Sequence, residues 1–223
     1  MKNISQEDYI SIIYKHRDGG GVIKSNTIAE RMNISNAAVT DMVRKLSRDG
    51  LINYTRYKGV SLTGSGETKA INLIRRHRIL ESFLYKIVKM PWEKVHEEVE
   101  NLEHGASDDL VNRLEVMLEY PEYDPHGDPI PDKKGKMPKA RSAVRLDLLP
   151  TEKSAIVVRV NDYDHEFLRY VASVGITMSS EVKVKSQLNF DKSIVLTVDG
   201  NDINMSQKMA SNIFVQEKKN RIK

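Results

Sequence analysis

Residues 23–52 read IKSNTIAERMNISNAAVTDMVRKLSRDGLI, and this stretch decides the fold of the first part of the chain. Its spacing of apolar residues predicts two short helices with a tight turn over residues 32–34 between them. We expect Ser25 or Asn26 to cap the first helix and Ser35 to cap the second, because such side chains accept hydrogen bonds from the free N–H groups at a helix start. The pattern is that of a helix-turn-helix.

The residues on either side complete this motif. Apolar residues at helical spacing predict a helix over residues 6–16 upstream. Downstream, Gly50 ends the second helix, and LINYTRYKGVSL at 51–62 predicts two short strands joined by a turn near Lys58 and Gly59. Helix, turn, helix and hairpin together predict a winged helix-turn-helix.

The second helix of the motif has two different faces. Its predicted buried stripe consists of Val39, Met42, Val43 and Leu46. On the other face, small and polar residues suit the major groove of DNA because they allow close approach to base edges, and basic residues suit phosphates. The predicted DNA-binding residues are Ser35, Asn36, Ala37, Thr40, Arg44, Lys45, Arg48 and Lys58.

Opposite charges are sorted into separate blocks of the chain. Residues 1–62 carry ten basic and six acidic side chains, residues 91–132 carry two basic and thirteen acidic ones, and residues 133–145 carry six basic and no acidic ones. A basic first block suits a polyanion, whereas a dense acidic block repels itself unless cations neutralise it.

The composition excludes several classes of protein. The chain has no cysteine, so it has no disulfide, no thiolate metal site and no cysteine nucleophile. No apolar run approaches the roughly 20 residues that span a bilayer, and the start MKNISQEDYISII lacks the hydrophobic stretch of a signal peptide. We therefore expect a cytoplasmic protein without a membrane partner, in which any metal is held by oxygen and nitrogen.

Beyond the winged motif, the pattern predicts helices and then strands. Helices are expected over 67–89, 91–104 and 107–120, and a segment rich in proline and glycine follows them. Short alternating runs and one short helix, HEFLRYVASVG, fit a small β-barrel. The predicted fold class is mainly α with a C-terminal β module. The predicted division is a winged helix-turn-helix at 1–63, a helical domain at 64–132, a basic linker at 133–145 and a small barrel at 146–223.

Two imidazoles and two carboxylates share one stripe of the predicted helix 91–104. They are His96, Glu100, Glu103 and His104, at positions i, i+4, i+7 and i+8. Like charges at this spacing destabilise a helix unless something offsets them, and a bound divalent cation is the economical offset. His77 and Glu81 on the preceding helix are another i, i+4 pair, so two metal sites are compatible with the pattern.

Two catalytic interpretations use the same residues. Paired carboxylates could perform general acid-base chemistry, and histidine with glutamate could hold a hydrolytic zinc ion. The zincin pattern H-E-x-x-H is absent, because Glu100 stands where the second histidine belongs after His96 and Glu97. We find no glycine-rich phosphate loop and no nucleophile elbow either, so we expect neither an enzyme nor a small organic substrate.

Three segments follow the winged motif: HRILESFL at 77–84, KVHEEVENLEHGASDDLVNRLE at 94–115 and DPHGDPIP at 124–131. With the motif before them, they resemble the diphtheria toxin repressor family of iron- and manganese-dependent regulators, and the resemblance extends over nearly the whole chain. It is most specific in E-x-x-E-H at 100–104 and in H-G-x-P-I-P at 126–131. The resemblance implies a DNA-binding domain, a helical metal-binding and dimerisation domain, and a small barrel of the src-homology type.

The resemblance also implies two sets of metal ligands. The site that activates DNA binding comprises Asp8, Glu100, Glu103, His104 and Asp124. The ancillary site comprises His77, Glu81, His96, His126 and Asp162. Ser11 departs from the pattern, because some manganese-type members have a glutamate there, and this argues against a binuclear activating site of that kind.

Oxygen ligands combined with imidazole suit Mn²⁺ and high-spin Fe²⁺, so one of these ions is the expected cofactor. We expect a homodimeric repressor in which the metal holds two recognition helices at the separation of about 34 Å between successive major grooves. Double-stranded operator DNA is the expected partner, and control of metal-ion homeostasis is the expected role. The open alternatives are a winged-helix regulator that senses zinc or holds a structural metal, and a metal-dependent hydrolase with an appended DNA-binding domain.

Overall fold

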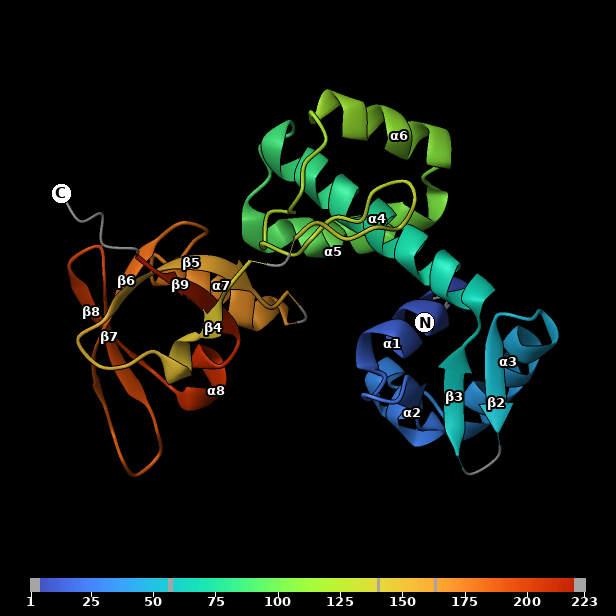
Figure 1. The fold of residues 1–223 in the computed structure, drawn as a ribbon, viewed down its shortest axis with the longest axis horizontal. Helices are drawn as coiled ribbons and strands as arrows, with labels where there is room; N and C mark the ends of the chain where they lie inside the picture. Colours follow the sequence, from blue (N-terminus) through green and yellow to red (C-terminus); the bar gives the residue numbers. More distant parts are fainter. Residues whose placement is uncertain (1–4, 56–57, 140, 163, 219–223) are drawn as a thin grey trace. The chain divides into compact units, whose positions relative to one another are not determined.

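The computed structural model describes residues 5–55, 58–139, 141–162 and 164–218. The chain forms two compact units, Met1–Arg75 with Pro131–Lys136 and Arg76–Ile130 with Met137–Lys223. Figure 1 shows the helices and strands in chain order. None of the helices in the described ranges is long and apolar enough to cross a membrane.

The first unit is a winged helix-turn-helix, as predicted. Its elements are α1 (Gln6–His16), β1 (Val22–Ile23), α2 (Ser25–Met32), α3 (Asn36–Arg48), β2 (Ile52–Thr55), β3 (Gly59–Leu62) and the start of α4 (Gly64–Lys86). The strands form an antiparallel sheet in the order β1-β3-β2. The predicted stripe of α3 lies in the core, where Val39, Val43 and Leu46 are fully buried and Met42 packs against them. Strand β1 was not predicted, because two residues give no alternation.

One of the two predicted helix caps is confirmed. The hydroxyl of Ser35 accepts a hydrogen bond from the backbone N–H of Ala38 at the start of α3. The prediction for α2 was wrong, because Lys24 is its N-cap residue and makes no side-chain cap bond. Strand β1 pairs with β3 as far as Ile23. Only Lys24 then remains between the strand and the helix, so Ser25 is already the first residue of α2.

The helices of the second unit are the remainder of α4, then α5 (Trp92–Leu102), the 3-10 turn η1 (Glu103–Gly105) and α6 (Asp108–Met117). Of these, α5 and α6 are shorter than the sequence pattern predicts, whereas α4 begins and ends three residues earlier than predicted. Ser107 is the N-cap residue of α6, and its hydroxyl accepts a hydrogen bond from the N–H of Leu110. The predicted helix 91–104 ends early, so Glu103 and His104 lie in η1 and leave the regular stripe of α5. Glu119 and Tyr120 have positive φ angles of 58° and 55°, which cannot continue α6.

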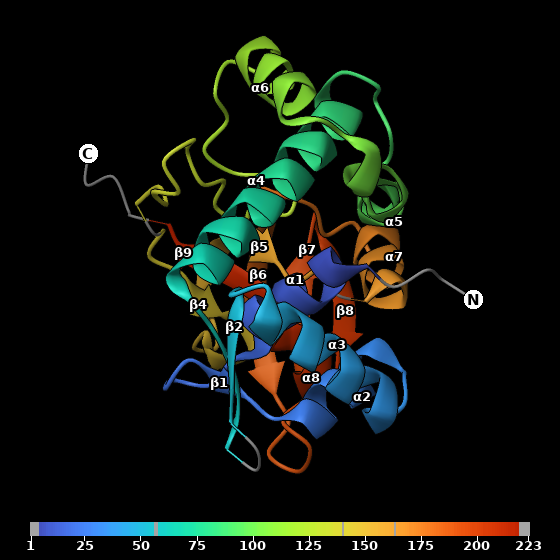
Figure 2. The same cartoon turned by 90° about the vertical axis from the view of Figure 1, so that its right-hand side faces the viewer.

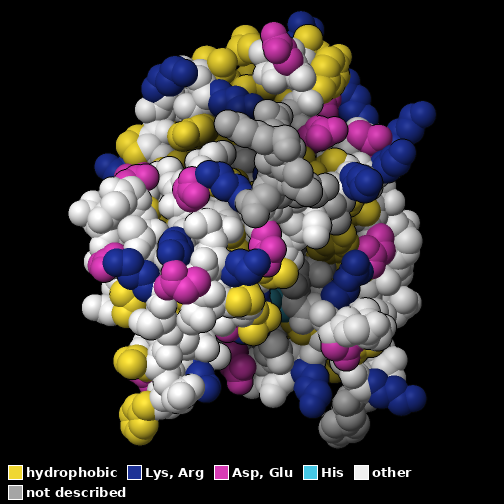
Figure 3. Space-filling view, turned by 60° about the vertical axis from the view of Figure 1, so that its left-hand side comes forward, with side chains coloured by type: hydrophobic (Ala, Val, Ile, Leu, Met, Phe, Trp, Pro, Cys, Tyr) yellow, Lys and Arg dark blue, Asp and Glu magenta, His cyan; other side chains and the backbone are white. Residues whose placement is uncertain are grey.

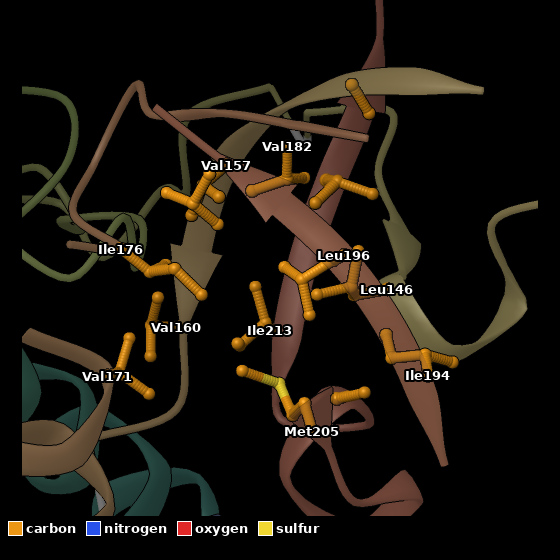
Figure 4. Close-up of a cluster of buried hydrophobic side chains, with 14 of the residues drawn as sticks. Leu146, Val157, Val160, Val171, Ile176, Val182, Ile194, Leu196, Met205 and Ile213 are labelled. Carbon is orange, nitrogen blue, oxygen red and sulfur yellow. The ribbon is translucent and has the colours of Figure 1, made fainter. Parts of the chain in front are cut away.

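The C-terminal half of the second unit is a curved antiparallel sheet around one apolar core. Its elements are β4 (Val144–Arg145), η2 (Leu146–Leu148), β5 (Ser154–Val160), α7 (His165–Ser173), β6 (Glu181–Gln187), β7 (Ile194–Val198), β8 (Asn201–Met205), α8 (Gln207–Ala210) and β9 (Ile213–Glu217). The strand order is β4-β9-β5-β6-β7-β8, and alternate side chains such as Val157, Val182 and Leu196 converge inside the sheet (Figure 4).

The predicted fold class, with its src-homology-type C-terminal module, is confirmed. Two strands of the C-terminal sheet were not predicted. The sequence of β8, NDINM, is too polar to alternate clearly, and β4 consists of the last two residues of the predicted basic linker. Val144 and Arg145 pair with Val215 and Phe214 of β9, so the end of that linker belongs to the sheet.

Helix α7 joins the sheet to the helical part of the second unit. Its residues Phe167, Leu168 and Val171 are buried in the core of the sheet, and Trp92 of α5 belongs to the same buried cluster. The two helices lie side by side in Figure 1 and Figure 2. This contact places the segment between β5 and α7, which contains Asp162, against α5.

The only tryptophan of the chain, Trp92, provides a spectroscopic probe of this packing. We predict that Leu168→Ala lowers the free energy of unfolding of the second unit by about 2 to 5 kcal/mol, because it leaves a cavity in a fully packed core. Urea unfolding followed by Trp92 fluorescence measures this loss. The exposed neighbour provides the control, since Arg169→Ala should change the same transition by no more than about 0.5 kcal/mol. Equal effects of the two substitutions would contradict the packing.

Candidate metal centre

Six buried or nearly buried side chains of the second unit converge from four segments. They are His77 and Glu81 of α4, His96 of α5, Asp124 and His126 of the turn that follows α6, and Asp162 after β5. We call them the histidine–carboxylate cluster. Their potential ligand atoms form two groups, each with all atoms within 4.8 Å of one another. His77, Glu81, His96 and Asp162 form the first group, and Glu81, Asp124 and His126 form the second.

Three atoms of the first group form a nearly equilateral triangle. Glu81 Oε1 lies 3.1 Å from His77 Nε2 and 2.9 Å from His96 Nδ1, and the two nitrogens are 3.1 Å apart. Asp162 Oδ2 lies 3.4 Å from His96 Nδ1. Ligand atoms at about 2.1 Å from one ion, at right angles, are about 3.0 Å apart, so the triangle has the size of one face of a coordination octahedron.

The second group is held by a tight turn over residues 124–128. Asp124 Oδ1 accepts hydrogen bonds from the backbone N–H groups of His126 and Asp128, both at 2.9 Å. Gly127 has φ of +87°, and a Cβ atom there would lie 2.1 Å from the carbonyl oxygen of Val158, so only glycine fits. The turn therefore uses Asp124 Oδ1 for its own structure and directs Oδ2 toward the cluster.

His126 is oriented by a backbone carbonyl. Its Nε2 lies 2.9 Å from the carbonyl oxygen of Trp92, which can only accept a hydrogen bond, so Nε2 carries a proton. The other nitrogen, Nδ1, lies 3.7 Å from Glu81 Oε1, beyond hydrogen-bond distance. A carbonyl that fixes the protonated nitrogen and leaves the other one facing a cluster is the usual support of a histidine ligand.

Burial and charge act in opposite directions on the three imidazoles. Burial lowers the pKa of His77, but Glu81 and Glu103 outweigh it and raise the pKa to about 9. Burial likewise lowers the pKa of His96, while Asp162 and Glu81 raise it to about 10. Burial lowers the pKa of His126, but Glu81 and Asp124 raise it to about 9. The carboxylates of the metal-free cluster therefore favour proton binding by its histidines, and the 3.1 Å contact between His77 Nε2 and His96 Nδ1 holds one proton between the two rings.

The carboxylates divide into two kinds. Burial raises the pKa of Glu81, but the three surrounding histidines outweigh burial and hold that pKa well below its usual value. Burial raises the pKa of Asp124 well above its usual value, and nearby Glu81 and Asp128 raise it further, although Arg78 opposes them. Asp124 thus lacks sufficient positive charge around it, and a cation would supply that charge.

The residues of the cluster fit a divalent cation. Glu81 Oε2, Asp124 Oδ2 and His126 Nδ1 are buried atoms that find no hydrogen-bond partner among the described residues. Buried polar atoms are nearly always paired, so three orphaned ligand atoms in one place indicate a missing partner. All ligand atoms are oxygen or imidazole nitrogen, which suits first-row divalent ions and gives no thiolate preference.

The predicted activating residues lie in different places. Glu100 lies on α5, and Glu103 and His104 lie in η1. Two of them contact the cluster: Glu103 Oε2 is 2.8 Å from His77 Nδ1, and Glu100 Oε1 is 3.8 Å from His96 Nε2. Asp8 belongs to the first unit, and its Oδ2 accepts the backbone N–H of Ser5 in the capping box of α1. Asp124, assigned to the activating site from the resemblance, lies instead with Glu81 and His126.

The sequence analysis did not identify His165 as a neighbour of this cluster. Its ring centroid lies 5.8 Å from that of His96, and its buried Nδ1 has no hydrogen-bond partner among the residues that the structure describes. His165 is far from His96 in the sequence, and only the packing of α7 against α5 brings the rings together. Its position shortly after Asp162 was the one available signal.

The predicted DNA-binding residues lie on α3, at its N-cap Ser35 and in the wing. Thr40 is half-buried, and its hydroxyl donates a hydrogen bond to the carbonyl of Asn36 within α3. The others are exposed: Ser35, Asn36, Ala37, Arg44, Lys45, Arg48 and Lys58. In the wing, the N–H of Lys58 donates to the carbonyl of Thr55, and residues 56 and 57 lie outside the described ranges.

An exposed basic helix in a winged helix-turn-helix and a buried cluster of nitrogen and oxygen ligands define the class of metal-dependent DNA-binding regulators. Three family models match the chain: the iron dependent repressor N-terminal DNA binding domain at 3–60, the iron dependent repressor metal binding and dimerisation domain at 63–132, and the FeoA domain at 144–217.

Full-length relatives agree with these matches. The iron-dependent repressor IdeR of Mycobacterium leprae is 30% identical over 224 residues, covering 95% of this chain and 96% of its own length. The HTH-type transcriptional regulator MntR of Oceanobacillus iheyensis is 35% identical over 120 residues, covering 54% of this chain and 81% of its own. A solved manganese-dependent transcriptional repressor in complex with manganese has a TM-score of 0.84 and 33% identity, covering 96% of this chain and 100% of its own. The chain belongs to the iron-dependent repressor family.

The pKa values predict how pH affects the metal-free protein. The pKa values of His77, His96 and His126 in the folded state are about 9, 10 and 9, above the ordinary 6.5. Protonation of these residues therefore stabilises the fold fully below about pH 6.5, and this stabilisation is lost as the pH rises through about 9 to 10. Urea unfolding of metal-free protein at pH 6.5, 8 and 9.5 should show a falling free energy of unfolding. A constant free energy over this range would contradict the protonated cluster.

Proposed function

We propose that this protein is a repressor whose operator binding is activated by Mn²⁺ or Fe²⁺, acts as a homodimer in the cytoplasm and controls metal-ion homeostasis. The observation that carries the proposal is the buried histidine–carboxylate cluster, with its orphaned ligand atoms, in a chain that also has an exposed basic recognition helix. Under this proposal the chain catalyses no reaction and takes no small organic substrate. We also propose that the chain divides into a winged helix-turn-helix up to residue 63, a helical domain up to residue 132, a basic linker, and a barrel to which β4 at Val144–Arg145 belongs.

The ligand atoms support manganese or iron but do not favour them over zinc. Relatives include a repressor named for iron and one solved with manganese, and another similar solved structure, ScaR, carries Zn²⁺ in its name. Three imidazoles in one cluster favour ions later in the Irving–Williams order, of which zinc is one. A zinc-sensing regulator is therefore the second candidate, and operator binding measured with each ion separately distinguishes the two.

We further propose that the activating site consists of Asp8, Glu100, Glu103 and His104, and that Asp124 belongs to the ancillary cluster. The contact between His77 and Glu103 supports a link between the two sites. A His77 that ligates through Nε2 must carry its proton on Nδ1, and this proton is then donated to the carboxylate of Glu103. The ancillary cluster would in this way orient one ligand of the activating site.

A second copy of the chain is the proposed partner of the helical part of the second unit. Several large apolar side chains there are exposed: Tyr85, Ile87, Val88, Leu110, Val116, Met117 and Tyr120. Figure 3 shows hydrophobic side chains at the surface on the end of the molecule formed by α6. Exposed apolar residues of this size are expected where another protein surface covers them. The family model of this segment is named for dimerisation as well as metal binding.

Metal titration of operator binding tests the activating site. We predict that Glu103→Gln or His104→Ala abolishes the metal-dependent gain in operator affinity, which is typically about 5- to 150-fold for coupled sites, while the fold is retained. Fluorescence anisotropy with labelled operator DNA, under anaerobic conditions for Fe²⁺, measures the gain. Glu98→Gln is the matched control, because Glu98 is an exposed residue of α5 outside both sites, and it should retain the full gain. A full gain in both site variants would refute the assignment.

The recognition surface makes a separate prediction about salt. Lys45→Ala or Lys58→Ala should weaken binding to all DNA sequences alike and reduce the slope of log affinity against log salt by about one, as expected for a lost phosphate contact. Asn36→Ala should change the sequence preference and leave the slope unchanged. Affinities for operator and unrelated duplexes across salt concentrations measure both effects. The predicted orientation of α3 is wrong if lysine and asparagine variants behave alike.

A further inference from the structure

The histidine–carboxylate cluster contains more ligand atoms than one divalent ion uses. Its two groups share a single residue, Glu81, whose Oε1 also lies 3.7 Å from His126 Nδ1 of the second group. Glu81 Oε1 is in contact with His77 Nε2 and His96 Nδ1, whereas Glu81 Oε2 has no hydrogen-bond partner in the described part of the chain. We propose that Glu81 bridges two divalent cations, so that the ancillary cluster is a binuclear centre. This inference rests on the proposed function, in which the cluster binds Mn²⁺ or Fe²⁺.

The first ion is assigned to the triangle of His77, His96 and Glu81. Its three edges of 3.1, 2.9 and 3.1 Å match neighbouring ligands of one ion, and Asp162 Oδ2 is a fourth ligand atom at 3.4 Å from His96 Nδ1. These four residues complete a set of two nitrogens and two oxygens. None of the three atoms orphaned in the cluster belongs to His77, His96 or Asp162.

The second ion is assigned to the orphaned atoms. Glu81 Oε2, Asp124 Oδ2 and His126 Nδ1 belong to side chains that are 0% exposed. Each residue has its other polar atom engaged, with Asp124 Oδ1 and His126 Nε2 bonded to the backbone and Glu81 Oε1 bonded to His77 and His96. Three remaining ligand atoms of three different residues, all buried, are what a cation requires.

The charges of the cluster tolerate two ions. Glu81, Asp124 and Asp162 supply carboxylates to the two groups, and Asp128 lies beside Asp124 in the same turn. Arg78 Nε lies 3.5 Å from Asp124 Oδ2, and Arg78 Nη2 lies 3.6 Å from Asp128 Oδ1, so Arg78 is shared by two carboxylates. With neutral imidazole ligands, the carboxylates of Glu81, Asp124 and Asp162 offset three of the four positive charges of two divalent cations. This bridging carboxylate is distinct from the glutamate that Ser11 replaces.

Manganese loading in a chain without the activating site tests the proposal. In the background Asp8→Asn with His104→Ala, we expect two Mn²⁺ per subunit by elemental analysis after gel filtration. The electron paramagnetic resonance spectrum should be that of an exchange-coupled pair, because a shared carboxylate brings the ions close together. Adding Asp124→Asn should leave one Mn²⁺ per subunit and an uncoupled six-line spectrum. The matched control is Asp128→Asn, a buried neighbour outside both ligand groups, which should retain two coupled ions.

Three results would overturn the binuclear centre: one Mn²⁺ per subunit in the background, two ions with an uncoupled spectrum, or a coupled pair that persists after Asp124→Asn. If the Asp124→Asn chain does not fold, the count and spectrum of the background alone decide. Operator binding by the unaltered chain is measured in parallel. Metal-stimulated binding with only one ion in the cluster rejects this inference alone, whereas a coupled pair without any effect on operator binding rejects the proposed function alone.

Discussion

The carboxylate of Glu81 is completely buried between three imidazoles, and the arrangement of the second unit depends on keeping that charge compensated. An ionised carboxylate without partners in a protein interior is strongly destabilising. Protonated histidines or cations must therefore surround Glu81 at every stage. The three histidines come from three segments, so the need to compensate the charge of Glu81 holds α4, α5 and the turn at 124–128 together.

Two ways of compensating Glu81 compete, and this competition makes the site responsive. Protons compensate it through His77, His96 and His126, whose pKa values are raised to about 9, 10 and 9. A cation must displace these protons, because an imidazole ligates only with a free lone pair. Under the proposed function, the same residues compensate Glu81 in the metal-free fold and would hold the cation. Such a site can exchange its protons for a cation while the protein remains folded.

The contact of His77 with Glu103 joins the histidine–carboxylate cluster to the 3-10 turn η1. Glu103 lies in the 3-10 turn η1, where the regular helix α5 has already ended. Since short 3-10 segments are poorly stabilised by their own hydrogen bonds, side-chain contacts have a large share in positioning them. Protonation or ligation of His77 can therefore influence the positions of Glu103 and His104.

Local patterns in the sequence were sufficient for the winged helix-turn-helix and for the residue types of the metal ligands. Apolar spacing in α3, the Ser35 cap and the turn of the wing are determined within a few residues, and local chemistry decides them. Helical spacing likewise brought His77 next to Glu81. Residues close together in the chain determine these features. The proposed ligands that are far apart in the sequence could be grouped only through the resemblance to a known family.

Only the tertiary structure decided which ligand atoms meet. Asp124 lies with Glu81 and His126 because the 124–128 turn uses its Oδ1 and directs its Oδ2 inward, and the residue pattern carries no sign of this division. His165 and Asp162 reach His96 through the packing of α7 against α5, between segments far apart in the chain. The ends of α5 and α6 were also misplaced, because the chain tightens into the 3-10 turn η1 at Glu103 and adopts a positive φ at Glu119. Sequence spacing determines which residues share a helix face, whereas contacts between elements depend on how those faces pack.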